Sequence, residues 1–288
     1  MIRRYAAVCL SVALAFLTLA PVGVAHAQHA HGGGGGAVTL RYRFVPGQNV
    51  SYAVALVQRS TVSTLAAAPD APLTILAHDS AATYVASDQE HRRVLGVDAA
   101  GNGRITLTVD HPYETINGRF IPPPADRRFV TLGTFTVASD GTQLAGPDER
   151  SRSDLAENGP VLPATPVALG AHWTTHVWLA VPGVALLVRR VTSVDTLVDF
   201  KQAGGEPVAL IDARIPLYAT TVMAVGGEAA HVEEAGVEAV RFAVGVESGQ
   251  VVSSVQRIVT DVTVRQGADV LRETFTIDAT QRRLSTAG

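Results

Sequence analysis

The sequence of 288 residues is poor in thiols, in lysine and in recognisable catalytic motifs. Its one cysteine, Cys9, lies within an apolar run close to the start of the chain, and its one lysine is Lys201. Removal of the apolar run leaves no thiol for a disulfide bond, a metal site or a covalent catalytic step. We therefore expect the remaining chain to be stabilised by packing and hydrogen bonds.

Charge is also scarce, because charged residues make up 17% of the chain and the formal net charge is −3 at pH 7. A protein that binds nucleic acid needs a basic patch or stripe to meet the phosphates. The arginines here are instead scattered along the chain as pairs, such as Arg92 with Arg93 and Arg189 with Arg190. The sequence therefore excludes nucleic acid from the expected partners.

Catalytic and cofactor motifs are missing as well. The sequence has no Gly-x-Ser-x-Gly elbow, no His-Glu-x-x-His motif, no phosphate-binding loop and no dinucleotide fingerprint. His172 and His176 have a spacing that suits one metal on a helix, but on a strand they stand ~13 Å apart. We therefore predict no catalytic residues, no metal site and no cofactor. An exported hydrolase without a recognisable motif stays open as a third interpretation, since two carboxylates from distant strands can form a catalytic pair.

The first 27 residues have the features of a secretory signal peptide. Two arginines precede an apolar run at residues 6–20, and Pro21 separates that run from a small-residue site that ends at Ala27. The run is shorter than the ~20 apolar residues of a membrane-spanning helix. We expect cleavage after Ala27, no transmembrane segment after that cleavage, and an exported protein that is periplasmic or secreted.

Beyond this signal, apolar and polar residues alternate, which is typical of strands with one face in the core. The pattern begins at residues 38–44 and continues at residues 50–56. Hairpin turns are expected at residues 100–103, 139–141, 204–205, 248–249 and 266–267, where glycine is flanked by alternating segments. In the first of these turns, we expect the pair Asn102-Gly103 to supply the positive φ angles of a tight hairpin.

We expect a mainly β protein of antiparallel curved sheets, arranged as a half-barrel or a sandwich, with at most one or two short helices. The expected parts are a signal peptide at 1–27, a flexible glycine-rich leader at 28–36, a first β-rich half at 37–146, a linker with a short helix at 147–166, and a second β-rich half at 167–288. Similarity between residues 95–110 and 197–212 leaves open two similar lobes or two unrelated segments that share alternation and turn glycines.

Several motifs at turns and strand starts of this sequence resemble those of other proteins. They are residues 40–44 followed by Pro-Gly-Gln at 46–48, and Leu-Pro at 162–163 followed by Pro-Val at 166–167, Gly170 and Trp173. On these motifs the chain resembles a group of uncharacterised exported bacterial proteins, a domain of unknown function. The chain departs from that pattern at residues 171–172, Ala-His, where an acidic and a small polar residue are expected. The resemblance implies an exported β-rich protein and supplies no activity.

The segment around the two tryptophans provides the candidate binding surface. Alternation places Trp173, Val177 and Leu179 on a face expected to be core. His176 and Trp178 lie on the opposite face, where a tryptophan is either covered by a neighbouring element or available to a partner. We therefore name His176 and Trp178 as candidate ligand-binding residues.

Two main classes of function are compatible with these features. In the first, the protein is a non-catalytic exported module that binds a lipid or another apolar or amphipathic molecule of the cell envelope. In the second, it is a structural or protein-interaction module of the cell envelope, whose sheets pack on each other and which has an envelope protein as its possible partner. A cavity enclosed by the curved sheet would favour the first class.

Overall fold

The computed structural model describes residues 36–66, 80–122, 129–147, 159–180, 188–225 and 228–284. Within these ranges the chain forms strands, turns and irregular segments, and no helix. None of this described part therefore offers a helix long and apolar enough to span a membrane. The expected signal peptide, the leader up to residue 35 and residues 148–158 of the expected helical linker lie outside the described residues.

Twelve strands of the described residues form one sheet, in which every pair is antiparallel. The strands are β1 (Asn49–Ala66), β2 (Ser80–Val97), β3 (Gly103–Ile116), β4 (Arg119–Ile121), β5 (Phe129–Val137), β6 (Gln143–Ala145), β7 (His172–Ala180), β8 (Val188–Ala203), β9 (Glu206–Val225), β10 (Glu228–Gly245), β11 (Val251–Gln266) and β12 (Asp269–Arg283). Their order is β6-β5-β3-β2-β1-β12-β11-β10-β9-β8-β7, with β4 beside β3. The prediction of a mainly β, antiparallel fold is confirmed.

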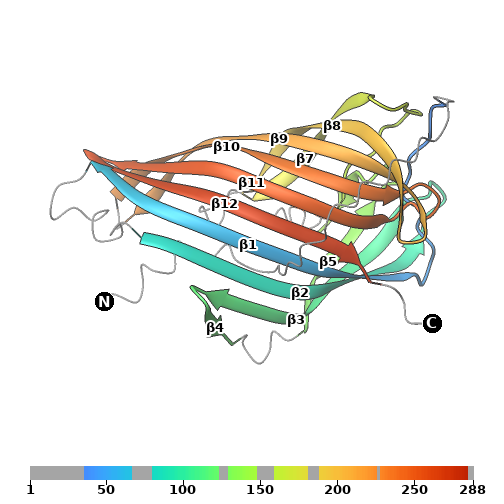
Figure 1. Cartoon of the computed structure of the whole chain (residues 1–288), viewed down its shortest axis with the longest axis horizontal. Coiled ribbons are helices and arrows are strands. Elements are labelled where there is room, and N and C mark those ends of the chain that lie inside the picture. The colour runs from blue at the N-terminus through green and yellow to red at the C-terminus, as the bar shows by residue number, and fades with distance from the viewer. Residues whose placement is uncertain are drawn as a thin grey trace.

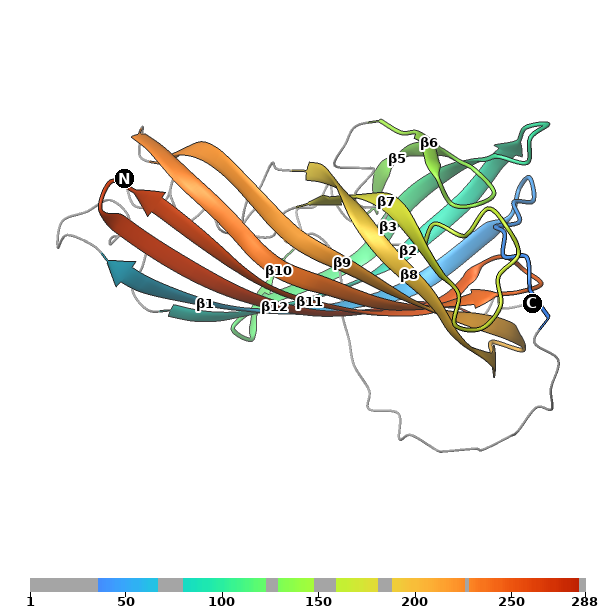
Figure 2. The same cartoon turned by 90° about the horizontal axis from the view of Figure 1, so that it is seen from above.

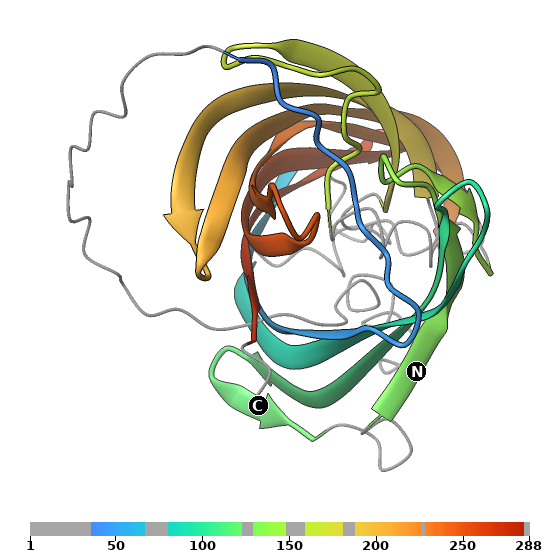
Figure 3. The same ribbon diagram turned by 90° about the vertical axis from the view of Figure 1, so that its right-hand side faces the viewer.

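The sheet is long, twisted and curved into an open trough (Figures 1 and 2). Seen from one end, its strands wrap around much of a circle, while β6 and β7 form separate edges (Figure 3). This arrangement corresponds to the expected half-barrel and not to a sandwich of two sheets. The seam between the expected halves is the pairing of β1 with β12, which runs from Tyr52 opposite Arg283 to Ala66 opposite Val270. The strands of both halves therefore belong to one continuous sheet.

The hairpins lie where the turn signals predict them, but the first turn is built differently. In the β2–β3 turn the positive φ belongs to Gly101, at 82°, and not to Asn102 or Gly103. The Asp98 carboxylate accepts hydrogen bonds from the backbone N–H groups of Ala100 and Asn102, both at 2.9 Å. Aspartate commonly organises turns in this way. The expectation for the Asn-Gly pair was therefore wrong, because the loop residues before it make the turn.

Residues 38–44 do not form the expected strand. Only Val38 pairs, in an isolated bridge with Val167, and the segment at residues 38–48, called the crossing segment below, passes over one end of the trough (Figure 3). The alternation still reports burial, because Leu40 packs in the core of the second half and Phe44 packs in that of the first. Alternation predicts which side chains are buried, whereas a strand also needs a neighbour to receive its backbone hydrogen bonds.

Two features of the sheet were not predicted. Residues 216–239 extend β9 and β10 into a long hairpin, although their mixture of alanine, glutamate and threonine weakens the alternation signal. Asn117 and Gly118, with φ of 50° and 77°, form the tight turn between β3 and β4. Asn-Gly is the residue pair that such a turn favours.

Candidate functional site

A cavity of about 300 Å³ lies at the end of the trough that the crossing segment covers. Its walls come from parts of the chain that are distant in sequence: the crossing segment, the strands β1, β2, β3, β5, β6, β7 and β8, the β5–β6 and β10–β11 turns, and residues 159–161. The cavity therefore exists only because the sheet curves enough to bring the strands of both halves around one space.

One end of the cavity is aliphatic. Val94 of β2 lies opposite Ile105 of β3 in the strand register, and Val137 follows on β5. These three side chains are buried and line the cavity together with Phe44 and Val50. Because they face the concave side of adjacent strands, they form a continuous apolar wall.

The other end of the cavity is polar and lies at the edge of the sheet. His176 and Arg190 are exposed and Trp178 is half-buried, and all three line the cavity. Trp178 lies opposite Arg190 in the β7–β8 register. Val177 also lines the cavity, although neighbouring residues of a strand point to opposite faces. A wall that includes three consecutive residues must run along the free edge of β7, the last strand in the order.

The structure places both predicted ligand-binding residues, His176 and Trp178, on the cavity wall. Trp173, predicted for the core face, packs against the main apolar cluster and donates its indole N–H to the carbonyl oxygen of Val161 at 2.9 Å. His172 is outside the cavity, and its Nδ1 lies 2.8 Å from Thr196 Oγ1. The assignment of faces along this strand is therefore confirmed, whereas the role of His176 and Trp178 in binding stays a prediction.

The sequence did not indicate that Arg92, Arg190 and the aliphatic wall belong to the same site. The arginine pairs were visible, but nothing in the sequence distinguishes the members that face a cavity from those that face solvent or the core. Arg189, next to Arg190, points to the other face of β8, where it forms an ion pair with the buried Glu234 at 2.9 Å. Neighbouring residues of a strand point to opposite faces, so the two arginines can be told apart only once it is known which face of β8 lines the cavity.

The two arginines of the cavity differ in how far their charge is already compensated. The Arg92 guanidinium lies 4.2 Å from the centre of the Tyr52 ring and 3.3 Å from Glu90 Oε2. For Arg190, the structure records no ion pair or hydrogen bond with the side chain of any described residue. Arg190 is therefore the cation of the cavity that is available to a ligand.

Carboxyl groups lie on the concave face beyond the cavity, and burial changes their ionisation. Burial, together with the nearby Glu90, Asp110 and Glu114, raises the pKa of Asp88 to about 8. Burial likewise raises the pKa of Glu238 to about 7. Asp88 is therefore mainly neutral at pH 7, and it adds little negative charge to the concave face.

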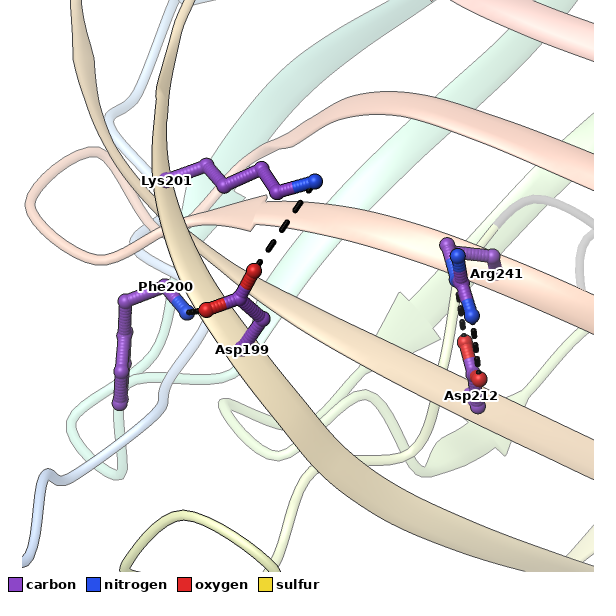
Figure 4. Close-up of polar contacts among 5 residues, drawn as sticks. All are labelled: Asp199, Phe200, Lys201, Asp212 and Arg241. Atoms are coloured by element: carbon purple, nitrogen blue, oxygen red, sulfur yellow. Dashed lines mark hydrogen bonds and ion pairs between the residues drawn. The ribbon is translucent and has the colours of Figure 1, made fainter. Parts of the chain in front are cut away.

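Figure 4 shows two separate groups of polar contacts on the strands β8 to β10. Arg241 donates two hydrogen bonds to Asp212, at 2.6 and 2.7 Å, and the two residues are opposite each other in the β9–β10 register. Asp199 accepts the backbone N–H of Phe200 at 2.8 Å and lies 3.9 Å from Lys201 Nζ. The Arg241–Asp212 pair joins β9 and β10 and therefore supports strand pairing.

Comparison of the sequence with protein-family models and with curated proteins finds no match. No activity can therefore be transferred from a relative. The chemistry of the cavity, with an aliphatic wall at one end and an aromatic and cationic edge at the other, is the basis for a function.

Proposed function

We propose that this protein is a non-catalytic exported module that binds a small amphipathic molecule of the cell envelope in the cavity. The observation that carries the proposal is the two-ended wall, which is buried and aliphatic at Val94 and Ile105 but exposed and polar at His176 and Arg190. Pockets of roughly 300–1,000 Å³ with apolar walls and a few polar groups are typical small-molecule sites. A ligand with one apolar and one polar end matches both walls.

Two further residues of the cavity wall favour binding of a partly polar molecule. Gln48 lines the cavity, and its buried Oε1 accepts no hydrogen bond from any residue in the described part of the chain. A buried acceptor without a partner costs about 1 to 3 kcal/mol, which a donor group on a ligand would offset. Trp178 offers a large, rigid ring with little conformational entropy to lose on binding.

The titratable groups of the cavity support binding over catalysis. The Tyr42 hydroxyl donates a hydrogen bond to the carbonyl oxygen of Pro160 at 2.9 Å, and burial raises the pKa of Tyr42 far above its usual value. His176 Nδ1 lies 3.4 Å from Thr192 Oγ1. Among the described residues, no ion pair orients His176 with a carboxylate, as a general base in a catalytic triad requires.

The proposal is tested by titrating the purified protein with the neutral fluorescent probe N-phenylnaphthylamine. We expect saturable binding at one site per chain. Thr142→Trp, at an exposed position on the cavity wall, should block binding by filling the space, whereas Val255→Trp, at an exposed position outside the cavity, should not. Absence of saturable binding to the wild-type protein would favour the structural or interaction module instead.

The proposed exported location rests on the sequence of residues 1–27. We expect the exported protein to begin at Gln28 and to carry no lipid. Measurement of its intact mass in the periplasmic and secreted fractions checks this. A mass that includes the first 27 residues would contradict the expected cleavage.

A further inference from the structure

We infer that the ligand carries a compact anionic headgroup, which Arg190 holds beside His176 and Trp178 at the edge of β7, while the apolar body lies toward Val94 and Ile105. The inference rests on the proposed function and deepens it, because it assigns the class of ligand and its orientation. The class is an anionic amphiphile with one apolar chain, such as an alkyl carboxylate or an alkyl phosphate.

The sign of the headgroup follows from the charges on the wall. Two arginines line the cavity, and Arg92 already has Glu90 at 3.3 Å and the Tyr52 ring at 4.2 Å. Arg190 has no recorded side-chain partner among the described residues. A cationic ligand would meet uncompensated like charge at Arg190, whereas an anion would compensate it.

The position of Arg190 suits a headgroup that stays partly hydrated. Arg190 is exposed, and its cross-strand neighbour Trp178 is half-buried on the same face. An anion at this edge keeps part of its hydration, so that binding does not carry the full cost of burying a charge. A guanidinium can donate two parallel hydrogen bonds to a carboxylate or phosphate, and His176 provides another polar group on this face.

The orientation follows from the opposite wall. Val94, Ile105 and Val137 are buried, and contact of an apolar chain with these side chains removes apolar surface from water, which favours binding. The reverse orientation would bring an anionic headgroup against these side chains, where the neighbouring cation, Arg92, already has Glu90 at 3.3 Å, and burying the charge there is unfavourable. Only one orientation therefore satisfies both ends of the cavity.

The test compares four ligands of equal chain length as competitors of N-phenylnaphthylamine: decanoate, decyl phosphate, decanol and decyltrimethylammonium. For the wild-type protein we expect at least one of the two anions to bind about tenfold more tightly than decanol, as one charge-assisted hydrogen bond allows. Decyltrimethylammonium should bind most weakly. The advantage of the anion should fall as salt is added, because Arg190 is exposed to screening.

Variants connect this preference to Arg190. Arg190→Gln should reduce the preference for the anion over decanol to near one, and Arg190→Lys should retain part of it. Arg119→Gln is the matched control, because it removes one positive charge from an exposed position on β4, outside the cavity. The control should keep the wild-type preference, and unchanged melting temperatures show that all variants are folded.

Each outcome leads to a distinct conclusion. If N-phenylnaphthylamine and all four ligands fail to bind, the proposed function is itself contradicted. If the probe binds and the four ligands compete equally, the cavity binds amphiphiles without regard to charge and the anionic class is overturned. If the preference for anions persists in Arg190→Gln, the assignment of the headgroup to Arg190 is overturned. Between decanoate and decyl phosphate, the tighter ligand identifies the headgroup.

Discussion

The two tryptophans of β7 differ in surroundings although they belong to one strand. Trp173 packs in the main apolar cluster and donates a hydrogen bond to Val161, whereas Trp178 is half-buried on the cavity wall. We predict that Trp173→Ala lowers the free energy of unfolding by about 3 to 5 kcal/mol. Trp178→Ala should lower it much less and should weaken binding of N-phenylnaphthylamine. Urea unfolding and probe titration of both variants check this, and equal losses of stability would contradict it.

Asp88 makes the stability of the protein depend on pH. Its pKa is about 8 in the folded protein, against an ordinary value of 3.8. The folded state therefore holds a proton that the unfolded state releases, so the contribution of Asp88 to the free energy of unfolding falls as pH rises from about 4 to about 8. We predict that Asp88→Asn stabilises the protein by about 1 to 3 kcal/mol at pH 8 and has little effect at pH 4.

Asp98 provides the opposite case for the same measurement. Hydrogen bonds from Asn102 and Ala100 hold the pKa of Asp98 below its ordinary value. Its contribution to stability is therefore present above that ordinary value and is lost as pH falls through the lowered pKa. Asp98→Ala should destabilise the protein at pH 4, 6 and 8, because all three values lie above the ordinary pKa of 3.8, whereas the effect of Asp88→Asn should grow with pH; urea unfolding at these pH values separates the two variants. A stabilising effect of Asp98→Ala at these pH values would contradict the role of this turn.

At the scale of elements, the crossing segment is held by contacts that are not part of the sheet. The Tyr42 hydroxyl donates to Pro160, and Gln250 Nε2 donates to the carbonyl oxygen of Arg43 at 2.9 Å. Gly249, in the β10–β11 turn, lies directly against the Arg41 carbonyl oxygen. The turn and the crossing segment therefore fit together only without a side chain at position 249.

A pair of turn glycines tests this fit. Gly249 and Gly267 have nearly the same φ, 62° and 59°, but a Cβ atom at Gly267 would contact nothing. Gly267→Ala should therefore cost only the strain of a left-handed alanine, about 1 to 2 kcal/mol. Gly249→Ala should cost about 1 to 3 kcal/mol more, because its Cβ clashes with Arg41. Urea unfolding measures the loss of stability in both variants. Equal losses would show that the crossing segment moves aside at little energetic cost.

At the scale of the whole molecule, one continuous sheet implies one cooperative unfolding transition. The β1–β12 seam links the two halves through backbone hydrogen bonds along most of both strands. Both tryptophans lie in β7, at one edge of the sheet, so their fluorescence reports on that edge, whereas circular dichroism reports on all strands. We predict coincident midpoints by the two methods. Earlier loss of the fluorescence signal would show that the second half unfolds separately.

The local features of the fold were predictable because they depend on neighbouring residues. Alternation and turn glycines predict the hairpins of β5–β6, β8–β9, β10–β11 and β11–β12, and parity along β7 separates the faces of Trp173 and Trp178. The same alternation wrongly predicted a strand at residues 38–44, because alternation indicates which side chains are buried and not whether the backbone pairs with a neighbouring strand. Residues 216–239 were missed because a strand paired on both sides tolerates a weak pattern.

Only the tertiary structure determines that the cavity exists and which residues line it. The sequence by itself determined a chain of antiparallel strands and placed His176 and Trp178 on the face away from the core. The curvature of the sheet brought Arg190 of β8 and Val94 of β2 to the same space, and the β1–β12 seam set how the two halves meet. Pairing between strands so far apart in sequence depends on the twist and register of the complete sheet, which no local pattern of residues specifies.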